Sequence, residues 1–274
     1  MTTADIQHLR EQTGVGMMDA KRALTATNGD MAAAIEHLRK AGQKIAASKS
    51  DRTVKEGGIG VWVSEDRKRA AVVALACETD FVARTDQFQA FSLQLAEHLG
   101  SLGLSDVTPE QFMEQPGMNG DATVKASLDS MIAKLGENMV IVQTVVVQAQ
   151  AGALDTYVHA SRKVVSVVSL VNGTPTALHD VAMHVAAMNP KYLNESVVPA
   201  DVIASEEGIY REQLQREGKP EAMWDKILPG KLKKFYADTC LVAQPFVKDD
   251  SMTVAAFLKQ QGDATVESYI RVAM

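Results

Sequence analysis

The chain has 274 residues, of which 46% are hydrophobic, so it can build two or three globular units with proper cores. Its net charge of −6 argues against a direct nucleic-acid-binding role, which usually needs an excess of Lys and Arg to neutralise phosphates. The two cysteines, Cys77 and Cys240, have no disulfide-framework or zinc spacing, and no apolar run approaches the roughly 20 residues of a membrane span. A reduced, cytoplasmic setting without membrane contact is therefore expected.

Residues 1–45 have helical patterning in three short pieces. Asp5 is placed to cap a first helix that Gly14 ends, and a second run with 3.6-residue apolar spacing follows it. Asp30 is placed to cap a third helix, which we expect to end at Gly42. The pattern predicts a three-helix domain that is too small to bury much surface by itself.

A polar, lysine-rich stretch follows and is interpreted as a linker over 46–57, ending at a Gly-Gly pair. Residues 1–56 hold nine Lys or Arg and seven Asp or Glu, so this end carries about +2 and the rest of the chain −8. A mildly basic N-terminal segment followed by an acidic remainder suits a protein partner better than a nucleic acid.

Strands followed by helices occur twice in the remaining sequence. In 58–140, two β-rich runs form an expected hairpin and helical patterns follow; in 141–274, three strand-like runs precede an apolar helix. We therefore expect an α+β core of two related halves with antiparallel three-stranded sheets. No residue-level repeat relates the two halves.

Two charged helical runs over about 200–237 predict a helical hairpin inserted into the second half. Pro229 lies in the second run, so that arm is expected to kink or split near Leu228. The apolar positions expected to form the seam of the hairpin are Ile209, Leu214, Trp224, Ile227 and Leu232.

The common catalytic motifs are absent from the sequence, including phosphate loops, zinc-protease motifs and nucleophile elbows. His179 and His184 are five residues apart on an expected helix and do not share a face as an i, i+4 metal pair would. His159 stands alone at a strand end. We therefore expect no catalytic residue, no bound metal and no cofactor, and we look for contact surfaces instead.

Two stretches are candidate contact surfaces. Met17 and Met18 are consecutive on a helix and point about 100° apart, so either both pack inside or one faces a partner. Phe81 follows a polar triplet and precedes the cap of the next helix, which we place at Thr85 or Asp86. Its ring is either a hydrophobic staple against that helix or an exposed anchor for a partner.

The stretches "LREQTGVGMMDAKRAL" (9–24) and "CETDFVARTDQF" (77–88) strongly resemble the two signatures of the elongation factor Ts family. "MHVAAMNPKYL", "GKPE", "GKLKKFY" and "LVAQPFVKD" match later family segments in the right order, so the resemblance covers nearly the whole chain. It implies a small ubiquitin-associated-like (UBA-like) head, a two-part α+β core and the inserted hairpin. Some members continue beyond "SYIRVAM" into a C-terminal helical module, so the contacts expected here lie in the head and core.

The resemblance also implies a function: nucleotide exchange on the GTPase elongation factor Tu, by binding and without covalent chemistry. In this exchange the GTPase releases GDP when its Mg²⁺ and phosphate site is disturbed, and GTP then binds. The implied partner-binding residues are Thr79, Asp80, Phe81 and Val82 near the Mg²⁺ site, Arg10, Met17 and Met18 in the head, and Tyr157 and His159 in the second half of the core.

Two other readings compete with nucleotide exchange. One is a non-exchanging interaction scaffold with a UBA-like head, and the other is a hydrolase or transferase with an unrecognised site. In some relatives the hairpin serves dimerisation, so self-association through 200–237 is a further candidate interaction, which Pro229 puts in question.

Overall fold

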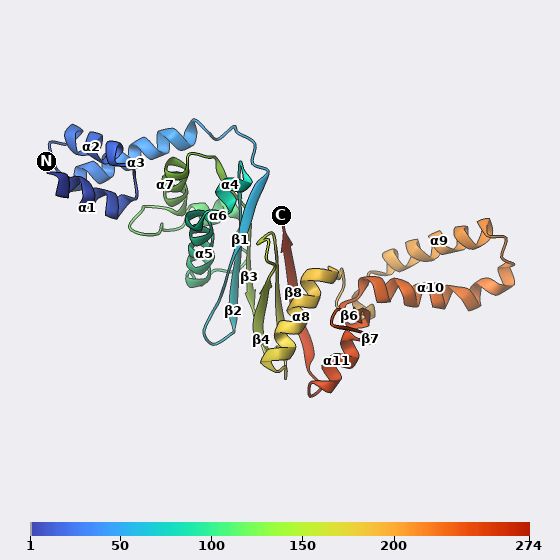
Figure 1. Ribbon diagram of the computed structural model, residues 1–274. Helices are drawn as coiled ribbons and strands as arrows, with labels where there is room; N and C mark the ends of the chain where they lie inside the picture. The colour runs from blue at the N-terminus through green and yellow to red at the C-terminus, as the bar shows by residue number, and fades with distance from the viewer. Residues whose placement is uncertain (1) are drawn as a thin grey trace. The chain divides into compact units, whose positions relative to one another are not determined.

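The computed structural model describes residues 2–274, and the chain divides into two compact units (Figure 1). The first unit consists of the residues up to Trp62, Ala71–Val146 and Met274, and the second of Val63–Ala70 and Val147–Ala273. The finer domain boundaries drawn from the sequence, at residues 45, 57 and 140, stay a prediction. Among residues 2–274, no helix combines the length and apolar character needed to cross a membrane.

The first unit opens with three helices, α1 (Thr3–Thr13), α2 (Met17–Ala26) and α3 (Met31–Ala47). The cap of α1 is Thr2, whose hydroxyl accepts a hydrogen bond from Asp5 N at 3.2 Å while the Asp5 carboxylate accepts one from Thr2 N. The prediction of Asp5 as the cap is wrong, because Asp5 takes the third position of a capping box. Gly14, with φ of 69°, ends α1 as predicted.

The third helix is longer than the sequence indicates. Its Asp30 cap is confirmed, since the side chain accepts a bond from Ala33 N at 3.0 Å, but the helix passes through Gly42. A Cβ at Gly42 would lie 3.6 Å from Cβ of Ala133 on α7 (Val124–Leu135), an ordinary van der Waals distance, so this buried glycine lies directly against α7. The core of the three-helix bundle consists of Leu9, Ala20, Ala23, Leu24 and Ala34.

The rest of the first unit combines a three-stranded sheet with helices. The strands, in sheet order, are β1 (Glu56–Val63), β2 (Arg69–Cys77) and β3 (Met139–Gln148). The helices are α4 (Asp80–Ala83), α5 (Asp86–Ser101), α6 (Pro109–Met113) and α7. Phe88 and Phe91 of α5 are buried in this core as expected, and Thr85 caps α5 by accepting a bond from Phe88 N at 3.2 Å.

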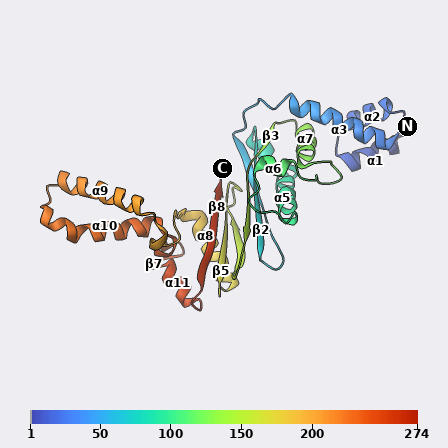
Figure 2. The same ribbon diagram turned by 180° about the vertical axis from the view of Figure 1, so that it is seen from behind.

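The second unit has its own three-stranded antiparallel sheet, in the order β4-β5-β8. Its strands are β4 (Ala153–Val158), β5 (Val164–Val171) and β8 (Thr265–Ala273), and α8 (Pro175–Met188) packs on them (Figures 1 and 2). A two-stranded ribbon, β6 (Pro245–Phe246) with β7 (Asp249–Thr253), and helix α11 (Val254–Gln260) complete the core. Short 3₁₀ turns occupy Glu195–Val197, Glu221–Met223 and Leu241–Ala243.

A helical hairpin of α9 (Ala200–Arg216) and α10 (Trp224–Thr239) extends this unit, with its arms side by side in both views (Figures 1 and 2). Pro229 lies inside α10, yet the helix is not split there. Asp225, whose carbonyl loses its helical donor, and Pro229 are both exposed, so water can satisfy that carbonyl. Ile209 is 46% exposed, so its place in the expected seam is wrong.

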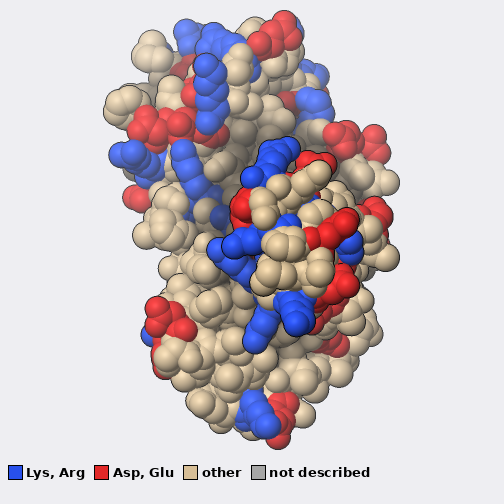
Figure 3. Space-filling model, turned by 90° about the vertical axis from the view of Figure 1, so that its right-hand side faces the viewer, with Lys and Arg blue, Asp and Glu red and all other residues tan. Residues whose placement is uncertain are grey.

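The predicted fold class is confirmed by this arrangement. Three helices come first, two three-stranded sheets carry helices, and a helical hairpin is inserted before the last strands. Over the hairpin, Lys and Arg occur together with Asp and Glu (Figure 3).

Candidate functional site

The Phe81 side chain is the most exposed large hydrophobic side chain of residues 2–274. It lies on the single helical turn α4, and 81% of its surface is accessible. A ring exposed to this degree is not the hydrophobic staple of α5, so that alternative is wrong. Large apolar side chains at the surface cost hydration free energy, so an exposed ring beside polar groups marks a candidate contact site.

Thr79 holds the α4 turn in place from its N-terminal end. Its hydroxyl accepts a hydrogen bond from Val82 N at 3.3 Å, which caps the turn. The same hydroxyl donates to Oε1 of Glu137 at 2.6 Å, and Thr79 N donates to Oε2 of Glu137 at 3.0 Å. Both carboxylate oxygens of Glu137 therefore accept bonds from one residue, which fixes that residue in position and orientation.

A second set of bonds ties the neighbouring residues together. Glu78 Oε1 accepts a bond from Asn138 N at 2.6 Å and lies 3.5 Å from the Arg52 guanidinium. The buried Asn138 amide donates to the carbonyls of Ser50 and Arg52, at 3.3 and 2.8 Å. Hydrogen bonds thus join Glu78 and Thr79, which follow β2, to Glu137 and Asn138, which precede β3. Sequence analysis singled out neither Glu137 nor Asn138, because no local pattern signals a contact over 58 to 60 residues.

Asp80 and Arg84 form an ion pair across the α4 turn, with a distance of 3.0 Å between Oδ2 and Nη2. Their side chains are 44% and 81% exposed, so the pair can be exchanged for other charged groups at low cost. Beneath the turn, burial raises the pKa of the Cys77 thiol to about 11, so at neutral pH it stays protonated. The solvent-accessible face of the turn therefore presents the Phe81 ring and the Asp80–Arg84 ion pair.

Met17 and Met18 open α2, immediately after the Gly16 cap, and both are exposed, by 56% and 62%. The alternative in which both pack inside is wrong, and so is the one in which a single methionine faces out, because the small bundle is filled by Ala20, Ala23 and Leu24 instead. Arg10, in the last turn of α1, is also exposed. The three-helix bundle thus presents two flexible thioether side chains that can adapt to a partner's surface.

Tyr157 and His159 lie at the end of β4 in the second unit. The partly buried Tyr157 ring packs edge-on against His179 with 5.9 Å between ring centroids. Exposed His159 accepts a hydrogen bond at Nδ1 from Ser161 N at 3.2 Å, because a backbone N–H can only donate. In this neutral tautomer the proton sits on Nε2, so His159 offers a hydrogen-bond donor to solvent.

The other histidine on α8 is a structural one. His184 is fully buried and accepts a bond at Nδ1 from Val247 N at 3.1 Å, while its Nε2 lies 2.9 Å from Oε1 of Gln244. Within residues 2–274, no three or more His, Cys, Asp or Glu side chains come together in a way that could hold a metal ion.

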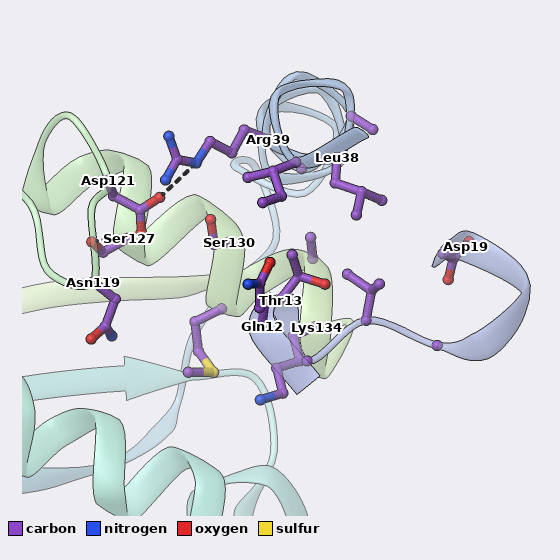
Figure 4. A pocket seen from close by; sticks show the side chains of 18 of the residues that line it. Gln12, Thr13, Asp19, Leu38, Arg39, Asn119, Asp121, Ser127, Ser130 and Lys134 are labelled. Atoms are coloured by element: carbon purple, nitrogen blue, oxygen red, sulfur yellow. Dashed lines mark hydrogen bonds and ion pairs between the residues drawn. The ribbon is translucent and has the colours of Figure 1, made fainter. Parts of the chain in front are cut away.

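A groove of about 1020 Å³ lies in the first unit, lined by α1–α3 on one side and by α5, α7 and the 118–121 loop on the other. Figure 4 shows the ion pair beside it, in which Arg39 Nε lies 3.3 Å from Oδ1 of Asp121. Arg39 also donates to the carbonyl of Gly120 at 2.8 Å. The polar lining is thus partly engaged in holding α3 to the loop, and its mixed character indicates no particular ligand.

Comparisons with known proteins agree with the signatures in the sequence. The family model described as "Elongation factor TS" matches residues 78–274, beginning one residue before Thr79. Proteins named elongation factor Ts from Methylococcus capsulatus, Aromatoleum aromaticum and Nautilia profundicola are 42%, 41% and 40% identical to this chain. The alignments cover 98–99% of this chain and 89–92% of theirs. With its exposed Phe81 turn, its three-helix head and its matches along nearly the whole length, the chain belongs to the elongation factor Ts family of translation elongation factors.

Proposed function

We propose that this chain binds the GDP form of elongation factor Tu and promotes release of GDP, so that GTP can bind. The observation that carries the proposal is the Phe81 ring, 81% exposed on a turn that Thr79 and Glu137 hold in place. Aromatic side chains that enter a partner's pocket often dominate a binding energy. A ring on a restrained turn also loses little conformational freedom on binding.

The partner-binding turn of this proposal consists of Thr79, Asp80, Phe81 and Val82. The ring enters between helices of the GTPase near its Mg²⁺, and the Asp80 carboxylate acts on the loops that hold the ion. Mg²⁺ demands nearly octahedral geometry, so moving its ligands by roughly 1 Å weakens nucleotide binding strongly. The Asp80–Arg84 pair supports this role, because an exposed carboxylate held at one end by an arginine is already oriented for a second partner.

Two further contact regions belong to the proposal. Arg10, Met17 and Met18 pack on a helix of the GTPase nucleotide domain, which suits their exposure and the adaptability of methionine. Tyr157 and His159 contact the partner from the second unit, where the outward Nε2–H of His159 supplies a donor. The binding energy of these regions offsets the cost of distorting the nucleotide site.

The proposed action needs no covalent step, only coupling between two binding events. If this protein lowers the affinity of the GTPase for nucleotide by some factor, nucleotide lowers the affinity for this protein by the same factor. Incoming GTP therefore displaces the protein, which acts again on another GDP complex. Small amounts of the protein would suffice to accelerate exchange on a larger pool of GTPase.

The test is the dissociation of fluorescent GDP from elongation factor Tu, with excess unlabelled nucleotide and substoichiometric amounts of this protein. Wild type should accelerate release, and Phe81→Ala should lose roughly 30-fold of that acceleration, the factor expected when a hot-spot ring is truncated. Because the ring is exposed, the free energy of unfolding of the variant should lie within about 0.5 kcal/mol of the wild-type value. Ile209→Ala, an exposed apolar truncation on the hairpin, is the matched control.

The outcomes separate the proposal from its rivals. A wild-type protein that binds elongation factor Tu and leaves GDP release unchanged favours the interaction scaffold. A wild-type protein that neither binds elongation factor Tu nor changes the rate of GDP release contradicts the proposal. If Phe81→Ala is folded and exchanges GDP as fast as wild type, exchange does not depend on the α4 turn.

A further inference from the structure

The α4 turn is short, and only its Val82 and Ala83 side chains pack, partly buried, against the core of the first unit. It is a four-residue helix without a buried side chain, and isolated helical turns are unstable in water because nucleation is costly. Its exposed ring and carboxylate add nothing to its packing. Packing of Val82 and Ala83 holds the C-terminal end of the turn, so its N-terminal end needs a restraint of its own if Phe81 is to be presented in a fixed direction.

Glu137 is the residue that does so from a distance in sequence. It lies between Gly136, which ends α7 with φ of 78°, and β3, so the chain reversal at Gly136 directs its carboxylate towards Thr79. Lys49 donates to the carbonyl of Gly136 at 2.7 Å and holds this reversal. Glu137 thereby joins the end of α7 to the N-terminus of α4.

The geometry of the bonds makes the contact specific. The Thr79 hydroxyl must donate to Glu137 and accept from Val82 N at the same time, which leaves it one rotamer. The second bond, from Thr79 N, fixes the peptide plane from which the turn starts. A carboxylate near the N-terminus of a helical turn is also electrostatically favourable.

We propose that Glu137 is a positioning residue for nucleotide exchange: its carboxylate locks Thr79 and so fixes the direction in which α4 presents Phe81 and Asp80 to the partner. Glu137 itself need not contact the partner. This inference rests on the proposed function, and it adds that the exchange activity of the turn depends on a side chain outside the signature segment.

The first experiment compares Glu137→Ala and Glu137→Gln with wild type in the fluorescent-GDP assay, with rates given per folded molecule. Glu137→Ala removes both hydrogen bonds to Thr79 and should slow release about tenfold or more. Glu137→Gln keeps one acceptor oxygen for Thr79, so it should slow GDP release less than Glu137→Ala does. Glu97→Gln, which changes an exposed carboxylate on α5, is the control and should match wild type.

A double-mutant cycle with Phe81→Ala distinguishes positioning from a merely structural role. If Glu137 acts through the ring, Glu137→Ala should have little further effect once Phe81 is truncated. Two independent defects would instead multiply, which would overturn the proposal. Backbone amides of 80–84 should also exchange hydrogen faster in Glu137→Ala, while those of α5 keep wild-type rates.

The assay also shows which idea fails. If wild type does not accelerate GDP release, the proposed function fails. If wild type accelerates release and Phe81→Ala loses it, but both Glu137 variants exchange GDP at the wild-type rate, only the positioning role of Glu137 fails. Should Glu137→Ala not fold, Glu137→Gln carries the same comparison, with partial slowing expected and an unchanged rate overturning the inference.

Discussion

Replacing His184 by leucine should destabilise the second unit and remove a pH dependence from its stability. The ring is fully buried between two polar partners, Val247 N and Oε1 of Gln244, and it stacks on Phe246 with 5.9 Å between centroids. Leucine has similar bulk and can satisfy neither partner. Each buried polar group left without a bond costs about 1–3 kcal/mol. The more apolar side chain offsets part of this cost, so we expect a net loss of about 2–4 kcal/mol.

The pH dependence has a definite sign. Burial lowers the pKa of His184 below its ordinary value of 6.5, and the hydrogen bond to Gln244 opposes this only in part. Below pH 6.5 the unfolded chain therefore binds more protons than the folded one. The stability contribution of the neutral ring is complete above about pH 6.5 and is lost as the pH falls from there through the lower pKa of the folded state.

The assay is urea unfolding between pH 8 and pH 5, with hydrogen exchange of α8 and β5 peptides to assign the change to the second unit. Wild type should lose stability below pH 6.5 and His184→Leu should lose less over the same range. Leu178→Ala, a buried truncation on the same helix that removes no titratable group, should lower stability and keep the wild-type pH dependence. Equal pH dependence in wild type and His184→Leu would refute the reasoning, as would unchanged stability of the variant at pH 8.

Two further substitutions test a polar network of the second unit and the core of the first. Glu267 accepts bonds from the three backbone amides of 150–152 and from the Ser169 hydroxyl, and the Ser169 bond and these amides hold its pKa below the ordinary 4.5. In thermal unfolding, the free energy of unfolding of Glu267→Gln should therefore be about 1 kcal/mol below that of wild type at pH 7. This difference should disappear as the pH falls below about 4.5, and a difference that stays the same at low pH would contradict the reasoning. Phe88→Ala should cost about 3–5 kcal/mol in urea unfolding, because Phe88 is fully buried, whereas a cost like that of Phe81→Ala would contradict its place in the core.

Sequence patterns predicted the elements of this fold where the determining signals are local. Asp30 and Thr85 cap helices, and Gly14 ends one, because each acts on backbone groups within a few residues of itself. The same reasoning failed at Gly42, and Pro229 does not split its helix, although both residue types usually interrupt helices. Gly42 is buried within α3 and lies against α7, and the backbone group freed at Pro229 is open to water. Neither circumstance leaves a local trace in the sequence.

The candidate site shows the same limit more sharply. The signature segment contains Phe81 and Asp80, and their polar surroundings suggested a contact, but whether the ring was buried depended on tertiary structure. Met17 and Met18 could not be resolved by periodicity, because alanines and Leu24 fill the bundle without them. A pattern states which residues can share a face, and only packing decides which face is covered.

The bonds around the α4 turn connect these observations. An exposed aromatic ring can act on a partner only if its direction is fixed before the encounter, since ordering a mobile turn would consume binding energy. Here the fixing groups come from residues 50–52 and 137–138, far from the turn in sequence, and they converge on Glu78 and Thr79. Under the proposed function, the turn carries the groups that would contact the partner, and the rest of the first unit carries the groups that hold them. If that proposal holds, mutations at such supporting positions should impair exchange without altering any residue of the turn.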